Sequence, residues 1–195
     1  MIIGFIGLMQ SGKTTASQYL QEKYDFEAIN FKDGLKEEMI QNFPRTMREM
    51  VRLLETIDYD GMDPWSGSNL FKKKPAIFRA FMQEYGTEVR RGDNEYYWTG
   101  KWARKAMECE KNVVVDDVRF LNEAEVIKNA GGKLVKIERQ DITDTGNHPS
   151  ETEMSKIVPD YFMSIEKGDF RGMERVIDTY VEQLQNKEKV EFEKI

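Results

Sequence analysis

The stretch Gly7-Leu8-Met9-Gln10-Ser11-Gly12-Lys13-Thr14-Thr15 decides how this chain is interpreted. It contains the pattern G-x-x-x-x-G-K-[ST], which is typical of a phosphate-binding loop, and it follows a short apolar run, residues 1–6, that indicates a buried strand. Glycines let the backbone N–H groups approach an anion closely, and a helix beginning at Lys13 directs its positive end at the same place. A strand before the loop and a helical pattern after it favour nucleotide binding over an ordinary glycine-rich turn.

The individual residues of this loop suit a bound ATP molecule. Lys13 is expected to reach the β- and γ-phosphates, and the Thr14 hydroxyl is expected to ligate the Mg²⁺ that accompanies ATP. The residues predicted to bind the ATP phosphates are Gln10, Ser11, Gly12, Lys13, Thr14 and Thr15. The implied cofactor is therefore Mg²⁺ with ATP.

Composition excludes several other classes of protein. The 195 residues correspond to a single domain, and the net charge of -6 argues against a partner that is a nucleic acid polymer. A single cysteine, Cys109, excludes an intramolecular disulfide, and with His148 as the only histidine a structural zinc site is not expected. No apolar run is long enough to span a bilayer, and a strand starting at Met1 leaves no room for a leader peptide. We therefore expect no membrane partner and a cytoplasmic location.

Apolar patterns predict an α/β protein with the P-loop NTPase fold, a five-stranded parallel sheet flanked by helices. The expected strands lie at residues 1–6, 26–31, 112–117, 133–139 and 161–165. The sequence between the second and third strands is mostly helical in pattern and too long for a simple crossover. The predicted divisions of the domain are a core at about 1–41 and 110–195, a helical insert at about 42–109 and a short lid at about 139–152.

The strand at residues 112–117 ends in Asp116 and Asp117, as expected of an acidic segment that positions Mg²⁺ beside the phosphate loop. Open α/β sheets bind ligands at the carboxyl ends of their strands, which favours this function over an incidental acidic strand end. Adjacent residues of a strand point to opposite faces, so only one of the two carboxylates can serve the site directly.

Three further segments carry a family resemblance. Residues 78–90 contain R-x-x-x-Q-x-x-G-T, residues 117–123 read D-x-R-F-x-N-E, and residues 148–151 read His-Pro-Ser-Glu. With the phosphate loop, they resemble the bacteriophage-type deoxynucleoside monophosphate kinases. This resemblance implies transfer of the ATP γ-phosphate to a deoxynucleoside monophosphate (dNMP), which yields the diphosphate and ADP. It also implies host cytoplasm if the chain is phage-encoded, and it leaves a homodimer open.

The resemblance also assigns roles to individual residues. Those implied at the dNMP are Arg79, Gln83, Gly86, Thr87, Trp98 and Glu123. Lys13, Asp117, Arg119 and Arg139 are implied in catalysis. Asp117 is preferred to Asp116 as the metal-binding carboxylate alongside Thr14, because it occupies the D-x-R-F position. Arg139 is chosen because it is the only arginine near the predicted lid.

The chemistry of the acceptor residues agrees with these roles but leaves alternatives open. Arg79 can hold a phosphate with a bidentate fork, Gln83 lies one helical turn further on, and Trp98 can stack on a base. Without the resemblance, the first two would be an exposed helix face and Trp98 a core aromatic residue. Other functions to be distinguished are a different small-molecule P-loop kinase, such as a dephospho-coenzyme A kinase, and a non-catalytic nucleotide-binding regulator.

Overall fold

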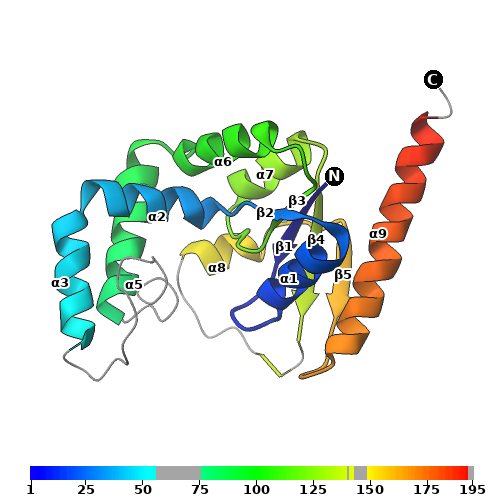
Figure 1. The fold of residues 1–195 in the computed structure, drawn as a ribbon, viewed down its shortest axis with the longest axis horizontal. Coiled ribbons are helices and arrows are strands. Elements are labelled where there is room, and N and C mark those ends of the chain that lie inside the picture. The colour runs from blue at the N-terminus through cyan, green and yellow to red at the C-terminus, as the bar shows by residue number, and fades with distance from the viewer. Residues whose placement is uncertain (56–75, 140, 143–148, 193–195) are drawn as a thin grey trace. The chain divides into compact units, whose positions relative to one another are not determined.

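The computed structural model describes residues 1–55, 76–139, 141–142 and 149–192 (Figure 1). It contains two compact units. One combines Met1–Asn30 with Lys105–Ile195, and the other is Phe31–Arg104. The second unit corresponds to the predicted insert, although it begins at Phe31 rather than near residue 42 and ends at Arg104 rather than near residue 109.

The first unit is built on a five-stranded sheet in which all neighbouring strands are parallel, in the order β2-β3-β1-β4-β5. The strands are β1 (Ile2–Ile6), β2 (Glu27–Ala28), β3 (Val113–Val115), β4 (Lys133–Glu138) and β5 (Tyr161–Ser164). The sheet and its flanking helices confirm the predicted fold class. The second strand is shorter than predicted: pairing with β3 covers only two residues, and Phe31 already belongs to a helix.

One face of the sheet is covered by α1 (Lys13–Tyr24) and α9 (Phe170–Phe192). Alternate residues of β1, Ile3 and Phe5, are buried against these helices, as expected for a strand whose side chains alternate between two faces. In Figure 1, α9 runs beside β5 and its last turns extend beyond the sheet. The rings of Tyr161 on β5 and Tyr180 on α9 lie 4.7 Å apart between centroids.

The opposite face packs against α7 (Leu121–Asn129), the helix that connects β3 to β4. Gly4 makes this packing possible, because a Cβ atom there would lie 2.8 Å from Ile127 Cδ1 and 3.0 Å from Leu134 Cδ2. The short helix α8 (Pro149–Met154) precedes β5.

The connections of β1 and β3 define where a ligand can bind to this sheet. The adjacent strands β1 and β3 lead into α1 and α7, which cross over the sheet toward β2 and β4 respectively. Right-handed crossovers in opposite directions place these two helices on opposite faces. The carboxyl ends of β1 and β3 therefore form the position at which open α/β sheets bind ligands.

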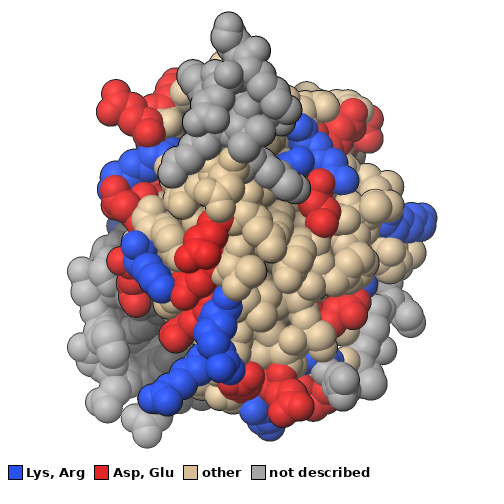
Figure 2. Space-filling view, turned by 90° about the vertical axis from the view of Figure 1, so that its right-hand side faces the viewer, with Lys and Arg blue, Asp and Glu red and all other residues tan. Residues whose placement is uncertain are grey.

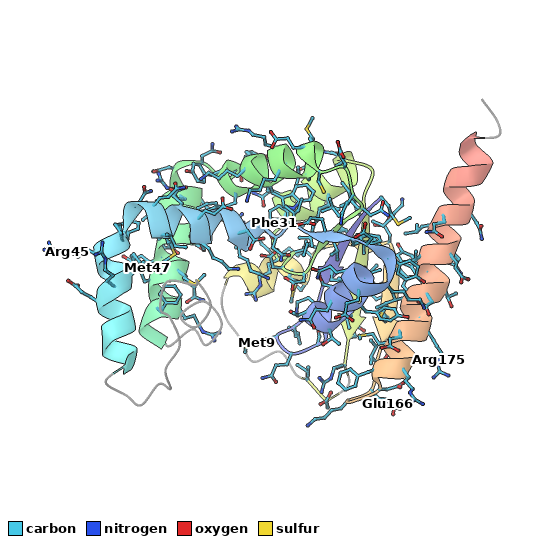
Figure 3. The ribbon with its side chains drawn as sticks, viewed as in Figure 1. Met9, Phe31, Arg45, Met47, Glu166 and Arg175 are labelled. Carbon is cyan, nitrogen blue, oxygen red and sulfur yellow. The ribbon has the colours of Figure 1, made fainter. Side chains whose placement is uncertain are left out.

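The second unit is helical and has a core of its own. It contains α2 (Phe31–Asn42), α3 (Pro44–Glu55), α5 (Ala76–Gln83), the π-helix η1 (Glu84–Arg91) and most of α6 (Tyr97–Glu108). Its core contains Met39, Met47, Phe78 and Tyr85. Figure 3 shows Met47 pointing from α3 toward α5, while Arg45 on the same helix points away.

Within this helical unit, residues 76–91 form two consecutive segments of different geometry. After α5, the backbone widens into η1, where the N–H of Gly92 donates to the carbonyl of Thr87. A bond between residues five apart is the mark of a π-helix, and wide turns of this kind are frequent at functional sites.

On the face of the molecule shown in Figure 2, basic and acidic side chains are interspersed among the described residues, and neither sign forms a continuous surface there. This distribution agrees with the small negative net charge of the chain. Among the helices of the described residues, none combines the length and apolar character needed to cross a bilayer.

Candidate active site

The loop between β1 and α1 has the backbone geometry that its glycines permit. A Cβ atom at Gly7 would lie 2.5 Å from the carbonyl oxygen of Ile137 and 2.6 Å from Ser11 Oγ, so no side chain fits. Gly12 has free space around it but a φ of 104°, which other residues rarely adopt. Gln10 is also left-handed, with a φ of 67°. The loop therefore curls tightly before α1 begins.

Lys13 lies inside this curl. Its Nζ donates hydrogen bonds of 2.7 Å each to the carbonyl oxygens of Gly7 and Leu8, and it lies 3.5 Å from Ser11 Oγ. The first helical bond, from Ala16 N–H to the carbonyl of Gly12, is 2.9 Å long. The ammonium group and the beginning of α1 thus meet at one point, as a phosphate-binding loop requires.

Thr14 joins the loop to the end of β3. Its Oγ1 donates to Asp116 Oδ2 at 3.0 Å, and Asp116 is only 7% exposed. The backbone N–H of Asp116 donates to Asn30 Oδ1 at 2.7 Å. The D-x-R-F pattern predicts Asp117 as the partner of Thr14 in a metal site. The structure pairs Thr14 with Asp116 instead. Adjacent residues of an extended segment point to opposite sides, so Thr14 is expected to contact only one of the two aspartates.

Glu123 has a structural position in α7. The side chain is buried, with the residue 2% exposed, and its Oε2 accepts the N–H groups of Arg119 at 2.8 Å and Phe120 at 3.1 Å. A glutamate in the first turn commonly satisfies N–H groups at a helix start in this way. In this position the residue fixes the backbone that carries Arg119, whose own side chain is exposed. The contact of Glu123 with the dNMP, which the resemblance implies, stays a prediction.

Arg139, just beyond β4, reaches the phosphate loop. Its Nη1 donates to the carbonyl oxygen of Gln10 at 2.8 Å. Its Nε and Nη2 form a fork with the carboxylate of Asp141, at 2.9 and 2.5 Å. This guanidinium lowers the pKa of the Asp141 carboxyl. Half of the predicted lid, including His148, lies outside the described residues.

The acceptor residues lie in the helical unit. Arg79 and Gln83 are both exposed and stand one turn apart on α5, on the same side of the helix. Gly86 is buried, and a Cβ atom there would lie 3.1 Å from Leu35 Cδ2, so η1 approaches α2 closely at this point. Thr87 is half-buried beside it.

Trp98 occupies a different environment from the one expected of a base-stacking residue. It is 4% exposed, and its Nε1 donates to the carbonyl oxygen of Gly86 at 2.9 Å. Its ring lies 3.5 Å from the position of a Cβ atom at Gly34 and meets the Tyr97 ring edge-on. Trp98 is therefore the core aromatic residue of the alternative interpretation, and it holds Gly86 in place.

Sequence reasoning missed one charged cluster, which is centred on Glu38 of α2. This carboxylate is buried and accepts hydrogen bonds from Tyr85, Tyr97 and Lys101, and it forms an ion pair with Arg90. Burial alone would raise its pKa, but the four hydrogen bonds outweigh burial and lower it to about 2. The one feature of the sequence that could have indicated the burial of Glu38 is its spacing of three residues from Leu35. This spacing places Glu38 on the face of α2 that packs on η1.

Sequence comparisons relate this chain to known proteins. The family model described as "Deoxynucleotide monophosphate kinase" matches residues 68–167. A protein of Acanthamoeba polyphaga mimivirus, named "Putative deoxynucleotide monophosphate kinase", is 32% identical over 162 residues, covering 80% of this chain and 83% of the mimivirus protein. This chain belongs to the deoxynucleotide monophosphate kinase family. Membership confirms the resemblance stated from the sequence.

One solved structure, the first of the two that follow, agrees with the fold. TT1252 from Thermus thermophilus is similar over 94% of this chain and 97% of its own, with a TM-score of 0.50 and 15% identity. Shikimate kinase from Aquifex aeolicus is similar over 96% and 98% of the two chains, with a TM-score of 0.43 and 15% identity. Identities this low concern the fold alone. The family itself makes the chain a kinase that acts on nucleotide substrates.

Proposed function

We propose that this kinase transfers the γ-phosphate of ATP to a deoxynucleoside 5′-monophosphate, which yields the deoxynucleoside diphosphate and ADP. The observation that carries the proposal is the convergence of Lys13, Thr14 and Asp116 at the carboxyl ends of β1 and β3 in a member of this family. Family membership supplies the class of acceptor, and the loop geometry supplies the donor site.

The donor site rests on the phosphate loop. Backbone N–H groups from Gln10 to Thr15 surround the phosphates, and oxygens of the β- and γ-phosphates replace the loop carbonyls as partners of Lys13 Nζ. The exchange is favourable because a phosphate oxygen carries formal charge, whereas a carbonyl oxygen does not.

The pair Thr14 and Asp116 fits Mg²⁺. A hydroxyl and a carboxylate oxygen 3.0 Å apart are hard ligands of the type that this ion prefers. The described residues contain no group of three or more His, Cys, Asp or Glu side chains that could enclose a metal. Such a sparse set suits Mg²⁺, which keeps several waters and binds substrate phosphates. When bound, the ion neutralises charge that develops on the phosphates.

The acceptor site rests on the exposed face of α5 and the adjoining turn of η1. Arg79 holds the phosphate of the dNMP with its planar fork, and Gln83 contacts the base through its amide. Gly86 and Thr87 contribute a backbone approach and a hydroxyl. In this proposal Trp98 acts through Gly86 and does not touch the base.

Catalysis consists of alignment and charge stabilisation. Phosphoryl transfer is an in-line displacement that needs no protein nucleophile, so the cationic side chains act on charge in the transition state. Arg139 is positioned for this by its bond to the Gln10 carbonyl, and Arg119 by the backbone bonds to Glu123. The homodimer and the cytoplasmic location expected from the sequence stay predictions.

The decisive experiment is an assay of ADP release with each common ribo- and deoxyribonucleoside monophosphate, with dephospho-coenzyme A, and with no acceptor. We expect stimulation by one or more deoxynucleoside monophosphates and none by dephospho-coenzyme A. Stimulation by dephospho-coenzyme A alone would identify a different P-loop kinase. ATP binding without stimulation by any acceptor would identify a nucleotide-binding regulator.

A further inference from the structure

We propose that Glu38 is a positioning residue for the acceptor site, because its carboxylate holds η1 in the wide helical form that presents Gly86 and Thr87. The proposal rests on the proposed function for its link to the dNMP. Its structural part, that Glu38 stabilises η1, stands on contacts within the helical unit alone.

The carboxylate of Glu38 joins three helices. From α2 it accepts the hydroxyl of Tyr85 on η1 at 2.5 Å, the hydroxyl of Tyr97 on α6 at 2.6 Å, and Lys101 Nζ on α6 at 2.7 Å. Arg90, at the other end of η1, forms an ion pair with the same carboxylate. The Glu38 side chain is 5% exposed, so these hydrogen bonds are shielded from bulk water. Hydrogen bonds are stronger in the protein interior than in water.

The two partners on η1 are five residues apart, and this spacing selects the wide helix. In an α-helix, residues five apart are rotated by about 140° from each other and cannot reach one carboxylate on the same side. In a helix closed by bonds between residues five apart, this rotation is much smaller, and the two residues lie on the same side. Arg90 Nε donates to Tyr85 Oη at 2.9 Å, and the Arg90 guanidinium lies 5.2 Å from the Tyr85 ring centroid, as this stacking requires.

The clamped turn of η1, residues 85–90, contains two of the proposed acceptor residues. Gly86 and Thr87 lie between Tyr85 and Arg90, and the N–H of Gly92 bonds to the Thr87 carbonyl across the wide turn. Gly86 is fixed from the other side by Trp98 Nε1. If η1 reverted to α-helical geometry, the residues after Tyr85 would rotate about the helix axis, and η1 would present Gly86 and Thr87 to the dNMP in a different orientation. The charge of Glu38 therefore acts on the dNMP through backbone geometry and not by contact.

The test compares Glu38→Gln with a matched control, Glu49→Gln, which removes the same charge from an exposed position on α3 of the same unit. Hydrogen exchange of the segment 84–91 is measured alongside separate KM values for dNMP and ATP. For Glu38→Gln we expect exchange in this segment to become about tenfold faster. We expect the KM for dNMP to rise about five- to tenfold while the KM for ATP stays unchanged. The control variant should match the parent in the exchange of segment 84–91, in the KM for dNMP and in the KM for ATP.

A second variant covers the case in which Glu38→Gln does not fold. Tyr85→Phe keeps the ring in the core and removes only the hydroxyl that Glu38 and Arg90 share, so it should shift exchange and the KM for dNMP in the same direction by a smaller factor. Unchanged exchange in segment 84–91 in the folded variants would overturn the proposal. So would a rise of both KM values together, which would indicate a general loss of structure. If the parent phosphorylates no dNMP, the proposed function fails, and exchange alone then decides whether Glu38 holds η1.

Discussion

At the scale of single residues, the two neighbouring aspartates at the end of β3 have different environments. Asp116 is 7% exposed and accepts the Thr14 hydroxyl, whereas Asp117 is half-buried. A carboxylate already in contact with the phosphate loop needs no movement to bind an ion placed at the ATP phosphates. We therefore propose Asp116 rather than Asp117 for the metal, and the role that the resemblance implies for Asp117 in catalysis stays a prediction.

Replacing each aspartate by asparagine separates these roles. We expect Asp116→Asn to require a much higher Mg²⁺ concentration for half-maximal turnover, because it removes the charged oxygen ligand beside Thr14. Asp117→Asn should leave the Mg²⁺ dependence close to that of the parent. Titration of turnover with Mg²⁺ measures both. The reverse ranking of the two variants would restore Asp117 as the metal ligand.

Lys13→Ala should abolish phosphoryl transfer. The ammonium group is the only side-chain cation within hydrogen-bonding distance of the Gly7 and Leu8 carbonyls among the contacts of the described residues. Loss of one positioned donor to transition-state charge commonly lowers kcat by about 100- to 1,000-fold, and loss of a full charge should do at least as much. Lys156→Ala, which alters an exposed lysine of the same unit, is the control. Turnover of Lys13→Ala near that of the control would remove Lys13 from the site.

The donor residues were predictable because they form a contiguous motif, in which spacing alone determines geometry. The environments of Trp98 and Glu123 were not predictable, since an aromatic or acidic residue in a helix has the same spacing whether it is buried or exposed. Only the structure shows that both residues are buried. The hydrogen bonds of Glu38 were still harder to predict, because its partners lie 47 to 63 residues away in the sequence.

At the scale of elements, one carboxylate joins the first helix of the sheet unit to the last. Asp178 on α9 accepts the hydroxyls of Tyr19 and Tyr24 from α1, each at 2.8 Å, and Lys23 Nζ at 2.8 Å. Burial opposes ionisation of Asp178, but the hydrogen bonds from Lys23, Tyr24 and Tyr19 prevail and lower its pKa. Because α1 begins at Lys13, this junction also steadies the helix that follows the phosphate loop.

Asp178→Asn should therefore destabilise the protein in a pH-dependent way. At neutral pH we expect the free energy of unfolding to fall by about 1–3 kcal/mol, as for loss of hydrogen bonds to a charged group. The native pKa of Asp178 lies below its unfolded value, so its contribution is complete above the ordinary carboxyl pKa of about 4 and disappears as the pH falls through the native value. The difference between variant and parent should shrink accordingly on acidification.

Denaturant titrations at several pH values measure this difference. Glu182→Gln, at an exposed position on the same helix, should leave the free energy of unfolding within about 0.5 kcal/mol of the parent. A gap between Asp178→Asn and the parent that stays constant down to strongly acidic pH would show that charge on Asp178 is not what joins α1 to α9.

Most elements could be predicted because their apolar periodicity is local. The five strands and their parallel arrangement followed from alternating strand and helix patterns, whereas the order of the strands in the sheet was not predicted. The π-helix η1 could not, because residues 76–91 have ordinary helical periodicity, and the wide turn depends on Glu38 from a distant helix. The end of β2 could not be predicted either. Apolar and polar residues alternate through residues 26–31, but Phe31 belongs to α2, where its ring packs on Trp102.

At the scale of the whole molecule, the proposal assigns one substrate to each compact unit. The sheet unit carries the phosphate loop, Asp116 and Arg139, and the helical unit carries Arg79, Gln83 and the clamped turn of η1. Such a division implies that a monophosphate and ATP bind at separate sites and meet only for transfer. Variants in one unit should then change the KM of one substrate.

A bisubstrate compound tests this division. An adenosine and a deoxynucleoside joined through a chain of phosphates should bind once per chain and compete with both ATP and dNMP. The linked compound should bind far more tightly than either substrate, because the second half binds intramolecularly. Arg79→Ala should weaken binding of the compound and of dNMP without changing the KM for ATP. Competition with ATP alone would contradict an acceptor site.

The most direct measurement follows the labelled γ-phosphate of ATP in the presence of a deoxynucleoside monophosphate. We predict that the label appears in the deoxynucleoside diphosphate in proportion to the ADP formed, and that Lys13→Ala abolishes its transfer. Label recovered only as inorganic phosphate, or retained in ATP with every monophosphate offered, would contradict it.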